Sequence, residues 1–211
     1  HLMFQGSAQV KGNGHFELVQ GAGGSLNGTT SFERTNYFET MPAHQLELAL
    51  WLEADRMGSL LAALDDESME NQRDVVKNER RQRYDNVPYG TAFERLTALA
   101  YPEGHPYHHT PIGSMADLDA ATLEDARAFF RTYYAPNNAV LSVVGDIDPE
   151  QTLAWIEGYF GSIPGHDGKR PPRDGALPDV IGEQLREEVV EEVPARALMA
   201  AYRLPEDGTR A

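Results

Sequence analysis

An acidic residue inside a charged helical segment is the first candidate for chemistry in this sequence. Glu79 lies in the segment VVKNERRQR, four positions after Val75 and three after Val76. Residues at these spacings share one face of a helix, so Glu79 falls on the apolar face. A carboxylate there needs a partner, and a metal ion is one. The adjacent Arg80 and Arg81 keep a second interpretation open, in which Glu79 belongs to a solvated, salt-bridged face.

Histidines offer a second possible metal site. His105, His108 and His109 form an H-x-x-H-H cluster, and imidazole is a common zinc ligand. The surrounding segment 101–114 contains three prolines and two glycines, which predicts an irregular loop. Packing among aromatic residues is the simpler account of these histidines, and a metal- or peptide-binding loop is the alternative. The histidines without a neighbour at ligand spacing are His15, His44 and His166.

A glycine-containing stretch is the third candidate. Residues 25–41 are rich in Thr, Phe and Tyr, which indicates two short strands with a turn near Glu33 and Arg34. An ordinary hairpin explains this pattern. The pattern also fits an edge strand that another backbone can approach closely, with Asn27 offering an amide. Edge strands bind extended peptides by adding a strand, so the second interpretation favours a peptide ligand.

The composition excludes several classes of function. The 211 residues suffice for one large core, or for one domain and part of a second. The net charge of -15 argues against a nucleic-acid partner, because phosphate binding needs concentrated Lys and Arg. The sequence lacks an apolar run of about 18 residues, so we expect no membrane span. It also lacks cysteine, which excludes disulfides, thiol catalysis and cysteine-based zinc sites.

Two predicted helices should position Glu79. The first opens at Pro42, and its leucines recur at three- and four-residue steps as far as Leu64. Asp65 and Asp66 end it and can cap the next helix, which contains Glu79 and runs to about residue 84. Charged residues, among them Glu47, Glu53 and Arg56, lie between the apolar positions of the first helix.

The remaining segments predict further helices and one buried strand. A helix follows Pro88, another starts at a capping box formed by Thr122 and Asp125, and a third covers residues 149–160. The apolar run 139–144 reads as a buried strand. This mixed order predicts an α+β fold.

The domain organisation is predicted from a change in composition. Residues 164–178 contain seven prolines or glycines among fifteen positions, which is typical of a linker. We therefore expect a first domain at 1–163 and a linker at 164–182. Residues 183–211 would then contribute the first strands of a second, incomplete domain.

Eight short segments along the chain belong together: HLMFQGS, GGSLNGTT, ERTNYF, LEADRM, ENQRDVVKNER, HPYHHTPIGS, FFRTYYAPNNA and VVGDID. In this order they resemble the insulinase/pitrilysin-type zinc metallopeptidases, which have an inverted H-x-x-E-H motif. The resemblance covers essentially the whole chain. It implies a half-domain with a mixed or antiparallel sheet and helices packed on one side.

The resemblance also implies site residues. His1 would be the second histidine of the H-x-x-E-H motif, and Glu79 the third zinc ligand from a later helix. The general-base glutamate and the first histidine would lie upstream, so this sequence contains no catalytic base and is not expected to hydrolyse peptides by itself. The edge strand at Asn27, Gly28 and Thr29 would hold the substrate. Gln72 stands where relatives often carry a second acid, so support of the metal from that position is in doubt.

The implied partners are an extended peptide or unfolded protein and a second half-domain, which closes on the substrate like a clamshell. The resemblance favours a bacterial protein, periplasmic or secreted. One alternative is a non-catalytic subunit of the same fold in a larger complex. An acid at position 79 favours the enzyme, because an unused site does not require it.

Overall fold

The computed structural model describes residues 1–166 and 183–203. It is an α+β structure, and its helices and strands are α1 (Gly14–Gly21), β1 (Ser25–Thr30), β2 (Thr35–Thr40), α2 (Leu46–Ala63), α3 (Asp66–Arg80), α4 (Ala92–Ala100), α5 (Met115–Ala120), α6 (Leu123–Tyr133) and α7 (Pro149–Phe160). Short 3-10 helices η1, η2, η4 and η5 cover Leu2–Phe4, Ala43–Gln45, Pro106–His108 and Pro136–Asn138, and a π-helical turn, η3, covers Arg81–Asp85.

The chain forms two compact units. Among the described residues, the first unit comprises 1–30, 35–74 and 119–166. The second comprises 31–34, 75–118 and 183–203. The division along the chain falls inside α3 and again inside α5. Each unit is therefore described by itself.

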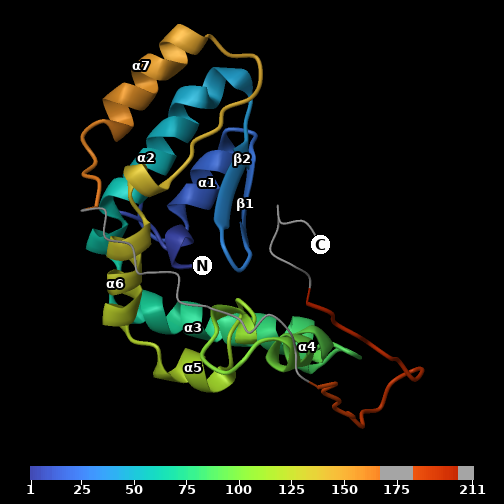
Figure 1. The fold of residues 1–211 in the computed structure, drawn as a ribbon. Helices are drawn as coiled ribbons and strands as arrows, with labels where there is room; N and C mark the ends of the chain where they lie inside the picture. Colours follow the sequence, from blue (N-terminus) through green and yellow to red (C-terminus); the bar gives the residue numbers. More distant parts are fainter. Residues whose placement is uncertain (167–182, 204–211) are drawn as a thin grey trace. The chain divides into compact units, whose positions relative to one another are not determined.

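The first unit is built around a hairpin and α2. Strands β1 and β2 pair in antiparallel register, with Leu26 opposite Glu39 and Gly28 opposite Tyr37. Helix α1 packs against β1, and α7 packs along α2 (Figure 1). Two apolar clusters join α2 to α1, β1 and α6, and burial of each large side chain contributes about 1.5–3 kcal/mol. One cluster contains Val10, Val19 and Leu52, and the other contains Met3, Leu60, Leu64 and Phe130.

Three helix starts confirm the sequence prediction. The Thr122 hydroxyl accepts a hydrogen bond from Asp125 N (3.1 Å), and the Asp125 carboxylate accepts one from Thr122 N (2.8 Å). This capping box starts α6. Asp65 and Ser68 exchange the same pair of bonds before α3. Asp148 caps α7, which covers the predicted range.

Arg80, at the end of α3, organises the second unit. Its side chain is buried, and Nη1 donates to the Gly113 carbonyl oxygen (2.6 Å). Its Nη2 donates to both carboxylate oxygens of Glu94 on α4 (3.2 and 3.0 Å), and Asp85 lies 3.5 Å from Nε. One guanidinium thus connects α3, α4 and the loop before α5.

Two groups of predicted strands are not formed. The run 139–144 has no strand structure, and Val140 and Val144 are 97% and 92% exposed. Residues 183–203 also contain no strand. A strand requires a hydrogen-bonded neighbour. In the described part of the chain, β1 and β2 pair only with each other, so the prediction of a buried strand was wrong for 139–144. Most of the predicted linker lies outside the described residues, and the domain division stays a prediction.

Candidate functional site

The two predicted zinc ligands belong to different units. His1 is exposed and precedes η1, and its carbonyl oxygen accepts a hydrogen bond from Phe4 N (2.9 Å). Glu79 lies in the last turn of α3 with 22% of its side chain exposed, and Arg83 Nη1 pairs with its carboxylate at 2.8 Å. Because His1 lies in the first unit and Glu79 in the second, their joint role as ligands stays a prediction.

Gln72, at the position where relatives often carry a second acid, is buried. Gln72 is 8% exposed on α3, seven positions before Glu79. That spacing is about two helical turns, so both side chains project from the same side of the helix. A buried amide replaces an acid there, and its support of a metal ligand also stays a prediction.

The predicted substrate strand is formed, and the structure explains why position 28 in it is a glycine. Asn27 and Thr29 are exposed on β1, and Asn27 Oδ1 accepts a hydrogen bond from Gly28 N (2.8 Å). A Cβ at Gly28 would lie only 3.3 Å from the Tyr37 ring and 3.4 Å from the Phe4 ring. Glycine at this position therefore lets two aromatic rings approach β1. The other edge of β1 has no strand partner among the described residues, as a substrate-binding edge requires.

The histidine loop packs as an aromatic cluster. His105 stacks on Tyr101 with ring centroids 4.9 Å apart, and its Nδ1 accepts a hydrogen bond from Tyr107 N (3.0 Å). His108 Nδ1 lies 2.8 Å from the Tyr101 carbonyl oxygen. In the described residues these histidines do not gather with other ligands around a common point. Packing among aromatic residues thus accounts for this loop.

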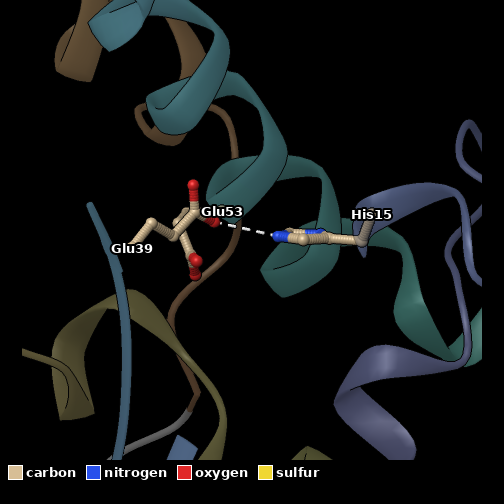
Figure 2. A group of neighbouring side chains, drawn as sticks. All are labelled: His15, Glu39 and Glu53. Carbon is tan, nitrogen blue, oxygen red and sulfur yellow. Dashed lines mark hydrogen bonds and ion pairs between the residues drawn. The ribbon is translucent and has the colours of Figure 1, made fainter. Parts of the chain in front are cut away.

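A different group of metal-type ligands is brought together by the fold. His15 from α1, Glu39 from β2 and Glu53 from α2 each offer one ligand atom, and these atoms lie within 4.8 Å of one another. Figure 2 shows the His15 ring pointing at the two carboxylates, which face each other. His15 Nε2 lies 2.9 Å from Glu39 Oε1. The exposed fractions of the side chains are 4% for His15, 7% for Glu39 and 24% for Glu53.

Arg56 is the counter-ion of this group. It is 2% exposed, and its Nη2 donates to both carboxylate oxygens of Glu53, one turn earlier on α2. Its guanidinium also lies over two rings, 5.2 Å from the centroid of Phe4 and 4.8 Å from that of Tyr37. Cation–π contacts of a desolvated Arg contribute about 2 kcal/mol. Arg56 therefore ties the acidic group to Phe4, three residues after His1.

Burial controls the protonation of the group. Burial, assisted by the charge of Arg56, lowers the pKa of His15 from 6.5 to about 4. Burial raises the pKa of Glu39 and of Glu53, while Arg56 acts in the opposite direction on both. His15 is therefore neutral at pH 7, and its contact with Glu39 is a hydrogen bond rather than an ion pair.

The sequence analysis missed this group, although one signal was present. Arg56 lies four residues after Leu52 and four before Leu60, and Glu53 lies three after Leu50, so both charges are on apolar rows of the helix. Charged residues there indicate a buried ion pair. His15 and Glu39 carry no such spacing, because 24 residues separate them.

His15 should make the protein less stable in acid. Between pH 6.5 and about 4 the unfolded chain protonates His15 and the folded chain does not, so acidification lowers the free energy of unfolding. We expect His15→Gln, which keeps a donor for Glu39, to remove about 3 kcal/mol of this acid sensitivity. Urea unfolding of both proteins at pH 7 and pH 4, with chelator present, measures the difference. If both proteins lose the same free energy of unfolding between pH 7 and pH 4, His15 is not the source of the acid sensitivity.

The comparisons with known proteins agree with the fold and with the predicted family. The family described as Insulinase (Peptidase family M16) matches residues 1–110, and the Peptidase M16 inactive domain matches residues 120–210. The zinc protease PqqE of Helicobacter pylori is 36% identical over 189 residues, which are 86% of this chain and 42% of the relative. The chain thus spans less than half the length of that relative.

Solved structures show the same relationship. The crystal structure of a protease from Helicobacter pylori superposes with a TM-score of 0.74 at 38% identity, covering 82% of this chain and 41% of that chain. The periplasmic protease PqqL from Escherichia coli has the same fold, with a TM-score of 0.67 at 24% identity over 82% of this chain and 20% of that chain. Together with the family match over residues 1–110, these similarities show that the chain belongs to the insulinase family, peptidase family M16.

Proposed function

We propose that this chain is part of a zinc-dependent endopeptidase that hydrolyses peptides bound in extended form. The observation that carries the proposal is the half-buried carboxylate of Glu79 in the last turn of α3. By the resemblance, Glu79 would be the family's third zinc ligand, and the chain is similar to a named zinc protease. A non-catalytic subunit would not require an acid there.

The residues present fit part of a zinc site. Imidazole and carboxylate are donors that zinc accepts, and His1 and Glu79 would be two of the three protein ligands that catalytic sites use. When bound, zinc lowers the pKa of a water molecule to about 7. In a longer protein, the residues upstream of His1 would supply the third ligand and the general base. Arg83 pairs with Glu79 and orients its carboxylate.

The substrate would lie along β1. Its open edge can pair with an extended peptide through backbone hydrogen bonds, and the exposed side chains of Asn27 and Thr29 would contact that peptide. A second half-domain, from the same or a partner chain, would complete the substrate site. None of the described helices is long and apolar enough to cross a bilayer. We propose a periplasmic or secreted location in a bacterium; the similar protease PqqL is named as periplasmic.

The test uses a longer protein that contains this chain and the residues upstream of His1. Cleavage of a quenched fluorescent peptide should require zinc, stop after treatment with a chelator and return when zinc is added. Unfolded peptides should be cleaved, and the same sequences held in a folded domain should not. Failure of the zinc-loaded protein to cleave any peptide would favour a non-catalytic subunit.

A further inference from the structure

We propose that His15, Glu39 and Glu53 bind a divalent transition-metal ion of the zinc or manganese class. The site uses none of the residues assigned to the peptidase. Its three ligand atoms lie within 4.8 Å of one another and come from α1, β2 and α2 (Figure 2). Figure 2 shows the His15 ring pointing toward the carboxyl groups of Glu39 and Glu53.

The closeness of the Glu39 and Glu53 carboxyl groups is unfavourable unless a positive charge lies between them. The ligand oxygens of Glu39 and Glu53 lie within 4.8 Å of each other, although carboxylates only accept hydrogen bonds. Glu39 Oε2 is buried and has no hydrogen-bond partner. An unsatisfied buried oxygen of this kind is unfavourable, and more so when the carboxyl group is charged. A cation between the carboxylates removes this cost, and so does a shared proton.

The local charge favours a divalent ion. Asp55 also acts electrostatically on His15, and its carboxylate accepts hydrogen bonds from Ser7 and Ser59. In the described part of the chain, Arg56 is the cation that acts on Glu39 and Glu53. Together with Asp55, the group then has a formal charge of about -2 when the carboxyl groups are ionised and His15 is neutral. A divalent ion neutralises this charge, whereas one proton neutralises half of it.

The donor set selects the kind of metal. One imidazole and two carboxylates suit zinc, manganese and related first-row ions, whereas calcium and magnesium prefer oxygen ligands alone. Each carboxylate oxygen of Glu53 has two lone pairs, and the hydrogen bonds from Arg56 use one on each oxygen. The remaining lone pairs can bind a metal ion. Glu53 is 24% exposed, which gives an ion access from solvent.

The ligands are held by rigid elements. Val19 on α1, Leu26 on β1 and Leu52 on α2 pack in one cluster. His15 lies four positions before Val19, Glu39 pairs with Leu26, and Glu53 follows Leu52. Sites supported by packed helices and strands hold their ligands more accurately than sites on loops.

The test measures zinc binding to this chain in a Glu79→Gln background, which removes the ligand of the peptidase site. After chelator treatment and dialysis, isothermal titration should show one zinc ion per chain. Zinc at a hundredfold excess over Kd should raise Tm by about 5–10 °C. Adding Glu39→Gln or His15→Gln should abolish both effects, and the matched exposed control Glu67→Gln should retain them.

A spectroscopic readout needs no change in the cluster. Zinc should shift the ring ¹⁵N resonance assigned to His15, and the resonances of His105, His108 and His109 should stay in place. Absence of a His15 shift at saturating zinc would overturn the proposal and leave a shared proton between Glu39 and Glu53. Shifts confined to the histidine loop would overturn it as well.

Discussion

Replacing Glu79 by glutamine in the longer protein is expected to lower kcat/KM for peptide hydrolysis by about 10³-fold or more. Loss of a residue that merely supports a metal ligand typically costs about 10–100-fold, and loss of a ligand should exceed this. Glutamine keeps the size of the side chain but removes its charge. Arg83 also loses its ion-pair partner, but 73% of its side chain is exposed, so stability should change little. Peptidase assays together with zinc analysis of the purified protein measure the effect.

Two matched variants separate this role from the alternatives. Glu67→Gln removes an exposed acid from the same helix and should leave activity and zinc content unchanged. His108→Ala tests the histidine loop and should retain zinc. Because the His15, Glu39 and Glu53 site is also proposed to bind zinc, the zinc contents of the variants and the unmodified protein must be compared with that site equally filled. If His108→Ala loses activity and zinc while Glu79→Gln keeps both, the assignment of Glu79 is wrong.

Replacing Arg56 by methionine is expected to lower the free energy of unfolding by about 3–5 kcal/mol at pH 7. Methionine keeps most of the apolar volume, so the loss comes from the charge. Glu53 would be left near Glu39 without its counter-ion, and Phe4 and Tyr37 would lose a cation over their rings. Urea unfolding with chelator present measures the loss. The loss should shrink in mild acid, because protonation of Glu53 then removes the unpaired charge.

A double-mutant cycle shows whether the ion pair causes this loss. Arg56→Met combined with Glu53→Gln removes both charges and should be less destabilising than Arg56→Met alone. A similar loss in the single and the double variant would assign the effect to packing of Arg56 against Phe4 and Tyr37. A change below about 1 kcal/mol in Arg56→Met would contradict the structural role of the pair.

The parts of the fold that the sequence predicted correctly depend on interactions between residues close together in the chain. The cap residues Asp65 and Thr122 place two helix starts, because a side-chain oxygen there accepts a backbone N–H within three residues. The structure adds a third cap, Asp148, in front of the helix predicted at 149–160. The hairpin at 25–40 follows from strand-forming residues around a short turn. The apolar face predicted for Glu79 is not formed in this way, because Val75 is 41% exposed and the Glu79 carboxylate pairs with Arg83.

Interactions between distant segments could not be read from local patterns. The run 139–144 has the composition of a buried strand, yet its formation depends on a neighbouring strand that the described residues do not supply. The predicted metal site likewise joins His1 and Glu79 through a resemblance alone, since no spacing rule connects residues so far apart.

By itself, the sequence predicted helices α2, α3, α4, α6 and α7, the hairpin and the resemblance to a zinc peptidase, because these depend on neighbouring residues and recurring segments. It did not predict α1, which carries His15, or α5. Only the tertiary structure brought His15, Glu39 and Glu53 together beside Arg56. Their meeting depends on how α1, β2 and α2 pack around Val19 and Leu52. The same packing removes water from the carboxyl groups and so raises the pKa of Glu39 and Glu53. A pattern of neighbouring residues in the sequence cannot predict this effect.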